Sequence, residues 1–108
     1  MNFVLSNPKY SIKFEVSSLD LPDKMRWIRA IDVCSSLNNG WRLPTLEELK
    51  IMYSDLHLLG IGDFQNKMYW SSTRKELNSV WGVFFKCGNA YCGSEYYFCR
   101  VRPVRDLV

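Results

Sequence analysis

The sequence has little charge of one sign, no long apolar run and only one histidine. Its 108 residues include 14 lysines and arginines against 11 acidic side chains, which gives a formal net charge of +3. This excess is too small to indicate a nucleic-acid partner, because nucleic-acid-binding domains concentrate more basic charge on one face. No stretch reaches the roughly 18 consecutive apolar residues of a membrane-spanning helix, so we expect no membrane insertion.

The sequence alone does not determine the cellular compartment. The N-terminus lacks the basic leader and apolar stretch of a signal peptide, so the chain as written is expected in the cytoplasm, unless it is the mature form of an exported protein. The chain has four cysteines, Cys34, Cys87, Cys92 and Cys99. An even number allows three sets of disulfide pairings, and the sequence does not determine whether any of them forms.

Motifs for metal or thiol chemistry are also missing. The spacing Cys87-x4-Cys92-x6-Cys99 lacks the close Cys-x2-Cys pairs of structural zinc sites. The single histidine, His57, has no cysteine that the sequence places beside it, as a catalytic Cys–His pair would require. We therefore expect no metal site, no cofactor and no catalytic residue.

What is present is a composition typical of one folded domain. Hydrophobic residues make up 47% of the chain and aromatic residues 15%, with only 23% charged. A chain of this length buries enough apolar surface to fold without compulsory cross-links. We expect a single domain over residues 1–108 with a core rich in rings.

The strongest local signal is a corner between two helices. Thr45 and Glu48 have the spacing of a capping box, in which each side chain accepts a hydrogen bond from the backbone N–H of the other residue. Pro44 favours an extended conformation at Leu43, and Gly40 suits the end of a preceding helix. The run predicts a helix end, a short extended bridge and a new helix from residue 46.

Hydrophobic periodicity gives the other elements. Residues 10–16 alternate as a half-buried strand does, with residues 2–5 as its hairpin partner. Apolar spacing of three and four predicts a first helix over residues 21–37, with Asp20 as N-cap and Pro22 in its first turn. Three later strands are predicted over residues 68–72, 80–86 and 96–104. This order predicts an α+β fold with helices packed on a sheet.

Five motifs in this order resemble a known family. They are Trp27-x2-Ala30-x3-Cys34-x2-Leu37, Gly40-Trp41-Arg42-Leu43-Pro44-Thr45-x2-Glu48-Leu49, Tyr69-Trp70-Ser71-Ser72-Thr73, Trp81, and Arg100-Val101-Arg102-Pro103-Val104-Arg105. Over residues 20–106 the chain resembles the bacterial Fib-succ-major paralogous domain family, in the wider C-type lectin-like and sulfatase-modifying-factor superfamily.

The resemblance implies a C-type lectin-like fold, with two helices packed on a small twisted antiparallel sheet and the first and last strands paired. It also implies adhesion or ligand binding rather than catalysis, and disulfides joining Cys34 to Cys99 and Cys87 to Cys92. Buried reduced thiols are the alternative. The tripeptides that bind calcium and sugar in C-type lectins, Glu-Pro-Asn, Gln-Pro-Asp and Trp-Asn-Asp, do not occur here, so any glycan recognition should be independent of calcium.

Residues 87–97 mix Tyr, Asn, Ser and Gly, a composition typical of binding loops, although an ordinary hairpin is an alternative. Strand alternation there predicts Glu95 and Tyr97 facing inward with Cys99 and Val101. It leaves Tyr96, Phe98 and Arg100 facing outward. The predicted binding residues are Asn89, Tyr91, Ser94, Tyr96, Phe98 and Arg100.

The structural residues predicted are Trp41, Arg42, Pro44, Thr45 and Glu48 at the corner, Trp70, and Arg102. Arg102 is predicted to pair with Glu47 or Glu48 of the second helix, and Trp41, Trp70 and Trp81 to be core rings.

The sequence thus favours a noncatalytic module that recognises an unknown protein or glycan without calcium. Two alternatives are a structural component of a phage or surface appendage and a thiol-based enzyme or redox protein. The oligomeric state is not determined by these patterns.

Overall fold

The fold was analysed in a computed structural model that describes residues 1–107. Within these residues the chain forms two α-helices, a short 3-10 helix and six strands. In chain order they are β1 (Phe3–Asn7), β2 (Ile12–Val16), α1 (Trp27–Ser36), α2 (Leu46–Asp55), η1 (His57–Leu59), β3 (Met68–Glu76), β4 (Ser79–Phe84), β5 (Asn89–Ser94) and β6 (Val104–Asp106). The α+β class predicted from the sequence is confirmed.

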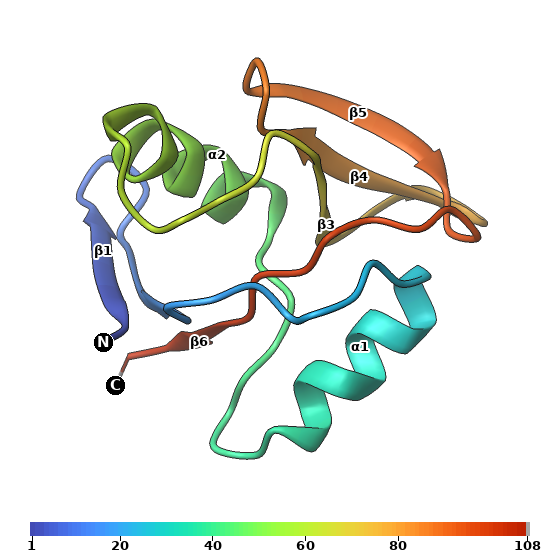
Figure 1. Ribbon diagram of the computed structural model, residues 1–108, viewed down its shortest axis with the longest axis horizontal. Helices are drawn as coiled ribbons and strands as arrows, with labels where there is room; N and C mark the ends of the chain where they lie inside the picture. The colour runs from blue at the N-terminus through green and yellow to red at the C-terminus, as the bar shows by residue number, and fades with distance from the viewer. Residues whose placement is uncertain (108) are drawn as a thin grey trace.

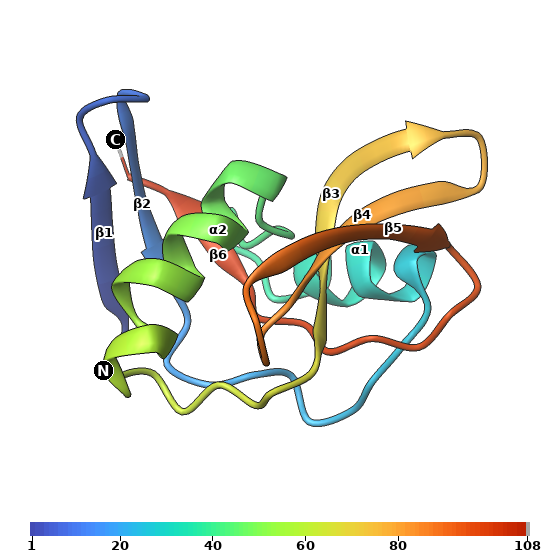
Figure 2. The same cartoon turned by 90° about the horizontal axis from the view of Figure 1, so that it is seen from above.

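The strands form two three-stranded antiparallel sheets, with the orders β1-β2-β6 and β3-β4-β5. Figure 2 shows β2 between β1 and β6, and the second sheet on the other side of α2. The predicted N-terminal hairpin is confirmed. The last strand, however, pairs with β2 rather than with the first strand, and two small sheets replace the single sheet that the resemblance implied.

Each α-helix covers its own part of the core. Helix α2 packs against β1, β3 and β4, whereas α1 packs against β3 (Figure 1). The α2 cluster includes Phe14, Leu49, Met52, Tyr69 and Phe85. The cluster beneath α1 includes Trp27, Cys34, Trp70, Cys99 and Val101.

Helix α1 begins at Trp27, six residues later than predicted. The segment before it is extended instead, because Leu21 N donates to Val101 O (2.9 Å) and Met25 exchanges both backbone hydrogen bonds with Cys99 (3.0 and 3.1 Å). Asp20 is therefore not an N-cap. The residue in that position is Arg26, which makes no side-chain cap hydrogen bond.

The predicted corner is confirmed. Asn38, Asn39 and Gly40 all have positive φ, which ends the path of α1. At the start of α2, Glu48 N donates to Thr45 Oγ1 (3.2 Å), and Thr45 N donates to Glu48 Oε1 (2.8 Å), which completes the capping box.

Arg42 joins this corner to the last strand. Its guanidinium donates to both carboxylate oxygens of Glu48 (2.7 and 2.9 Å) and to Asp106 Oδ1 (2.5 Å). The hydrogen bonds to Glu48 are the largest cause of a raised Arg42 pKa. Trp41 is half-buried beneath the guanidinium of Arg105, 4.6 Å from its ring centroid.

Of the three tryptophans predicted to be core rings, only one is fully buried. Trp70 is buried as predicted, and its indole N–H donates to Met25 O (2.7 Å). Trp41 and Trp81 are only half-buried, and a cationic side chain lies over each ring: Arg105 over Trp41 and Lys75 over Trp81.

The predicted strand over residues 96–104 is wrong. Strand β5 comes earlier and ends at Ser94, whose carbonyl accepts a hydrogen bond from Tyr97 N (3.1 Å) and whose Oγ accepts one from Tyr96 N (3.1 Å). These contacts turn the chain out of the sheet. Residues 95–103 then form an irregular segment that crosses back to β6 through isolated bridges with Met25 and Tyr69.

Candidate functional site

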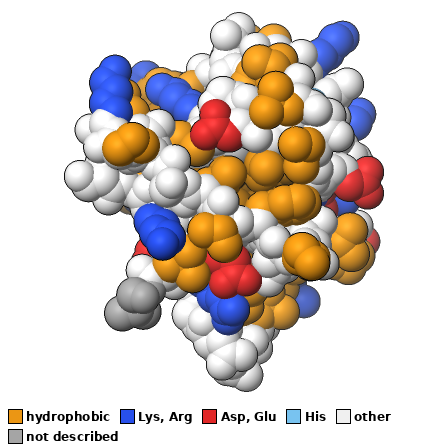
Figure 3. All heavy atoms as spheres, turned by 90° about the vertical axis from the view of Figure 1, so that its left-hand side faces the viewer, with side chains coloured by type: hydrophobic (Ala, Val, Ile, Leu, Met, Phe, Trp, Pro, Cys, Tyr) orange, Lys and Arg blue, Asp and Glu red, His pale blue; other side chains and the backbone are white. Residues whose placement is uncertain are grey.

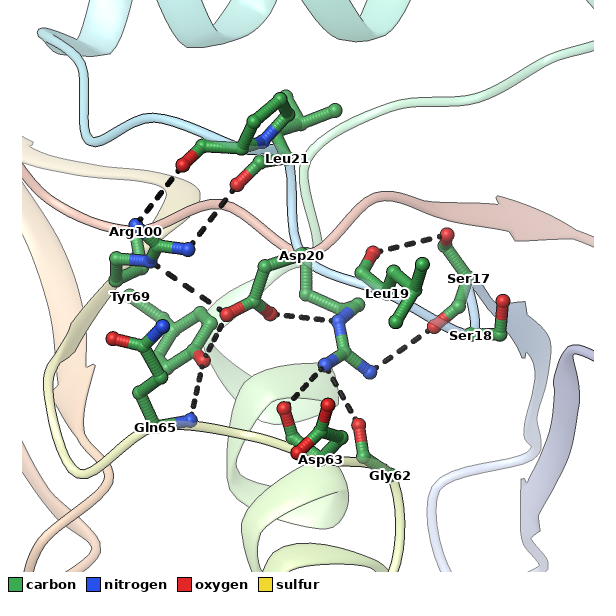
Figure 4. A network of polar contacts seen from close by, with 12 residues as sticks. Ser17, Ser18, Leu19, Asp20, Leu21, Gly62, Asp63, Gln65, Tyr69 and Arg100 are labelled. Carbon is green, nitrogen blue, oxygen red and sulfur yellow. Dashed lines mark hydrogen bonds and ion pairs between the residues drawn. The ribbon is translucent and has the colours of Figure 1, made fainter.

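A buried polar network holds the segment that follows the candidate binding surface (Figure 4). The Arg102 side chain is 0% exposed, and its Nε donates to Asp20 Oδ1 (2.8 Å). Its other guanidinium nitrogens donate to the carbonyl oxygens of Ser17 (3.1 Å), Gly62 (2.7 Å) and Asp63 (3.3 Å). The predicted pairing of Arg102 with Glu47 or Glu48 is wrong, because Arg42 occupies Glu48 and Asp20 lies closer to Arg102.

Tyr69 and Arg100 complete this network. The Tyr69 hydroxyl donates to Asp20 Oδ2 (2.6 Å) and accepts from Gln65 N (2.9 Å). Burial and then the hydrogen bond to Asp20 raise the pKa of Tyr69 well above its usual range. Arg100 was predicted to face outward, but its side chain is only 13% exposed and Nε lies 3.6 Å from the Asp20 carboxylate.

Immediately before this network, three consecutive aromatic side chains point outward. Tyr96, Tyr97 and Phe98 are 57%, 63% and 59% exposed, and we call them the aromatic loop. The inward orientation predicted for Tyr97 is wrong, because β5 ends at Ser94 and strand alternation does not continue. Glu95, Cys99 and Val101 are buried as predicted.

The aromatic loop is anchored at both ends. On one side, Trp27 N donates to Glu95 O (3.2 Å), and the Glu95 carboxylate accepts from Arg74 (3.3 Å). On the other side, Cys99 forms its two hydrogen bonds with Met25. The loop therefore presents its rings from fixed backbone positions.

A pocket of about 460 Å³ lies on the Phe98 side of the loop. Its apolar lining comes from Phe98 and from side chains of the extended segment and α1: Leu21, Pro22, Met25 and Val33. Three cations and one carboxylate also line it: Lys24, Arg26, Arg29 and Asp23. The Arg26 guanidinium lies 5.3 Å from the Phe98 ring centroid and 6.0 Å from that of Tyr96, within range of a cation–π interaction.

A second pocket of about 210 Å³ lies on the Tyr97 side, and we call it the Tyr91–Tyr97 pocket. All three strands of the second sheet contribute residues to it. Its lining is largely apolar and consists of Met68, Trp70, Val80, Tyr91, Cys92, Gly93, Tyr97 and Cys99. The Tyr97 ring lies over Gly93, where an added Cβ would come within 3.2 Å of the ring.

Of the six predicted binding residues, four lie on the candidate surface and two make contacts within the domain. Tyr91 lines the second pocket, and Tyr96 and Phe98 belong to the aromatic loop. Asn89 is exposed at the start of β5 and donates weakly to the Tyr91 hydroxyl (3.4 Å). Ser94 shapes the turn and Arg100 is turned toward Asp20, so these two make internal contacts.

Sequence reasoning missed several neighbours of this surface. Lys24 and Arg26 were assigned to the interior of a helix, so no signal placed them beside Phe98. Lys75 also escaped notice: its Nζ lies 3.6 Å from Cys92 Sγ, a contact between β3 and β5 that has no local sequence signature.

All four cysteines are free, so the two disulfides implied by the resemblance are not present in the structure. Cys34 and Cys99 are buried, and burial raises the pKa of each thiol to about 11. Cys87 and Cys92 are exposed. Among residues 1–107 no group of three or more His, Cys, Asp or Glu side chains is arranged to hold a metal ion. Neither α-helix is long and apolar enough to cross a bilayer.

Apolar exposure alone does not single out the aromatic loop. Figure 3 shows that hydrophobic side chains also gather on the face at the β1 side of the molecule. The loop differs in combining three adjacent rings, anchored ends and a pocket on each side.

Comparison with known protein families matches residues 10–105 to the Lcl C-terminal domain. The chain belongs to this family. The Lcl C-terminal domain is a lectin-like module, and its family is related to the C-type lectin-like and sulfatase-modifying domains, as the motifs around the Gly40–Leu49 corner indicated. No curated protein matches this Lcl C-terminal domain at a significant level.

Proposed function

We propose that this Lcl C-terminal domain is a noncatalytic binding module that recognises a protein or glycan through the aromatic loop and its two flanking pockets. The observation on which this rests is the exposure of Tyr96, Tyr97 and Phe98 on a backbone anchored at both ends. Tyrosine and phenylalanine rings supply large contact areas with few rotatable bonds, so binding costs them little side-chain entropy.

The anchoring supports this proposal energetically. A loop that must become ordered on binding loses part of the interaction free energy to that ordering. Here the hydrogen bonds of Glu95 and Cys99, together with the buried Asp20–Arg102 pair, hold the loop before any ligand arrives. The rings can therefore act as preformed contacts.

We further propose that recognition needs neither calcium nor a reactive thiol. The sequence lacks the calcium-binding tripeptides of C-type lectins. Burial disfavours the thiolate at Cys34 and Cys99, which is the nucleophilic form of cysteine. Binding would then depend on ring stacking, apolar contacts and hydrogen bonds.

The test is a glycan array and a protein array probed with the purified domain in the presence of a calcium chelator. We expect hits that the double variant Tyr96→Ala, Phe98→Ala loses at least tenfold in apparent affinity. Tyr10→Ala is the matched control, because Tyr10 is an aromatic side chain 53% exposed in the turn between β1 and β2, in the other sheet. Hits that the double variant leaves unchanged would exclude the aromatic loop as the binding site.

A further inference from the structure

One edge of the second sheet is open. Strand β5 is the outer strand in the order β3-β4-β5, and Figure 1 shows it at the rim of the molecule. Glu95 N donates to Asn78 O (3.0 Å), which marks these two residues as a hydrogen-bonded pair across the β4–β5 ladder. Such pairs alternate along antiparallel strands. Tyr91 and Gly93 therefore direct their backbone groups toward β4, and Ala90 and Cys92 direct theirs away from the sheet.

The opposite edge of the same sheet is covered by the chain itself at Met68 and Trp70. Trp70 N donates to Arg100 O (3.0 Å) and Arg100 N donates to Met68 O (2.8 Å), so residues of the crossing segment cover β3. Strand β3 also has shifts in its register with β4. Both are devices that protect a sheet edge from pairing with other chains.

Strand β5 has none of these devices. Its sequence, Asn-Ala-Tyr-Cys-Gly-Ser, contains no proline and no charged residue. Its register with β4 runs without a shift from Ser79 opposite Ser94 to Phe84 opposite Asn89. An uncharged edge with a regular register and free backbone donors and acceptors is the form of edge to which an extended peptide can add.

The Tyr91–Tyr97 pocket adjoins this edge on one face of the sheet. Gly93 has no side chain, and the Tyr97 ring packs over it as one wall of the pocket beside the strand. The pocket volume of about 210 Å³ is below the roughly 300 Å³ at which small-molecule sites begin, and suits a single apolar side chain.

The other face of the edge has the opposite chemistry. Cys92 directs its side chain to this face, where Lys75 Nζ lies 3.6 Å from Cys92 Sγ and 5.5 Å from the Trp81 ring centroid. Neighbouring residues of an added strand point to opposite faces. If one side chain enters the pocket, the residues on either side of it face Lys75, where a carboxylate is favoured.

We propose that β5 binds an extended segment of a partner protein as a fourth strand. An apolar side chain of this segment enters the Tyr91–Tyr97 pocket, and a neighbouring acidic side chain pairs with Lys75. This inference rests on the proposed binding function and narrows its ligand from a protein or glycan to an extended peptide.

The probe is the peptide acetyl-Thr-Thr-Glu-Leu-Glu-Thr-Thr-amide, which places a carboxylate on both sides of leucine and so suits either strand direction. Its control is the isomer acetyl-Thr-Glu-Thr-Leu-Thr-Glu-Thr-amide, which has the same composition but puts both carboxylates on the leucine face. Amide hydrogen exchange is followed by NMR with the thiols kept reduced.

In the free domain, the amides of Ala90 and Cys92 should exchange fast and those of Tyr91 and Gly93 slowly. Saturating probe should slow Ala90 and Cys92 at least tenfold. The probe should bind about twofold to fivefold more tightly than its isomer, as one exposed ion pair allows.

Charge reversal gives a second readout. Lys75→Glu should reverse the preference, so that acetyl-Thr-Thr-Lys-Leu-Lys-Thr-Thr-amide binds more tightly than the acidic probe. Lys13→Glu makes the same change in net charge on β2, in the other sheet, and should leave the preference unchanged.

Slow exchange of Ala90 and Cys92 in the free domain would overturn the proposal, because the edge would already be covered. So would an absence of added protection with every peptide at millimolar concentration. If array hits are glycans whose shifts map to the Phe98 pocket, the edge proposal fails and the binding function stands. An array without hits would overturn both.

Discussion

The Asp20 carboxylate and the Arg102 guanidinium are 82 positions apart in the sequence and meet at 2.8 Å in the interior. Arg102 also has the Phe64 ring beneath it, with the guanidinium carbon 3.9 Å from the ring centroid. The pair joins the segment that precedes α1 to the segment that follows the aromatic loop. It is therefore both a core contact and part of the support for the candidate surface.

Removal of Asp20 should destabilise the domain strongly. Asp20→Ala leaves the buried Arg102 charge without its carboxylate, which typically costs about 3–5 kcal/mol. Urea unfolding of both proteins measures this difference. The matched control is Asp106→Ala, whose carboxylate pairs with Arg42 but is 77% exposed, so its loss should be about 1 kcal/mol or less. Equal losses in the two variants would contradict the structural role assigned to Asp20.

The capping box at the start of α2 should contribute a measurable amount. Thr45→Ala removes the acceptor for Glu48 N and should lower the free energy of unfolding by about 1 kcal/mol. Thr45→Ser keeps the hydroxyl and should recover most of this loss. Ser36→Ala, which removes a hydroxyl at the other helix, should change stability by less, since Ser36 caps no N–H group. A Ser variant as unstable as the Ala variant would rule out the hydroxyl as the cause.

The four thiols should divide into two pairs by reactivity. In the native reduced domain, Cys87 and Cys92 are exposed and should react quickly with a thiol reagent at neutral pH. Cys34 and Cys99 are buried with a raised pKa and should react only as the protein unfolds. Mass spectrometry after timed labelling identifies the sites, and addition of urea should release the slow pair. Four equally fast thiols would contradict the burial of the α1 cluster.

Stability should fall in alkali. The folded state raises the pKa of Cys34 and Cys99 from 9.0 to about 11 and also raises that of Tyr69. The folded protein thus holds protons that the unfolded chain releases first. This contribution is complete below about pH 9 and is lost as the pH rises toward 11, by at most about 3 kcal/mol for each thiol.

Urea unfolding between pH 8 and 11 measures this slope. Cys34→Ala should lower stability at neutral pH because it leaves a small cavity, and it should also flatten the alkaline slope. A variant with the wild-type slope would show that Cys34 does not contribute to it.

Elements of the fold that depend on residues close together in the sequence could be predicted, and those that depend on distant residues could not. The corner from Gly40 to Leu49 was predictable because a capping box joins residues three positions apart. The N-terminal hairpin was predictable because its pattern and turn are also local. Residues 21–25 were not. Leu21 and Met25 have helical spacing, but their backbones pair with Val101 and Cys99, residues that no local pattern connects to them.

In the candidate site, too, local features could be predicted from the sequence and long-range contacts could not. The composition of residues 87–97 indicated an aromatic surface, and Tyr96 and Phe98 are exposed on it. The turn at Ser94 ended the alternation that predicted an inward Tyr97. The cations near the rings come from the extended segment before α1 and from β3. Sequence patterns therefore could not predict the contacts of Arg26 and Lys75.

The pairing of β2 with β6 also determines when the domain can complete its folding during synthesis. Glu15 and Arg105, which pair across these strands, are 90 positions apart. Until residues 104–106 leave the ribosome, β2 lacks its second neighbour and Arg102 cannot reach Asp20. A two-stranded hairpin alone is marginally stable in water, and long-range pairing of this kind is slow. While this domain is being synthesised, Phe14 and Val16 should therefore lack their final cover until residues 104–106 have emerged, and exposed apolar surface of this kind favours aggregation.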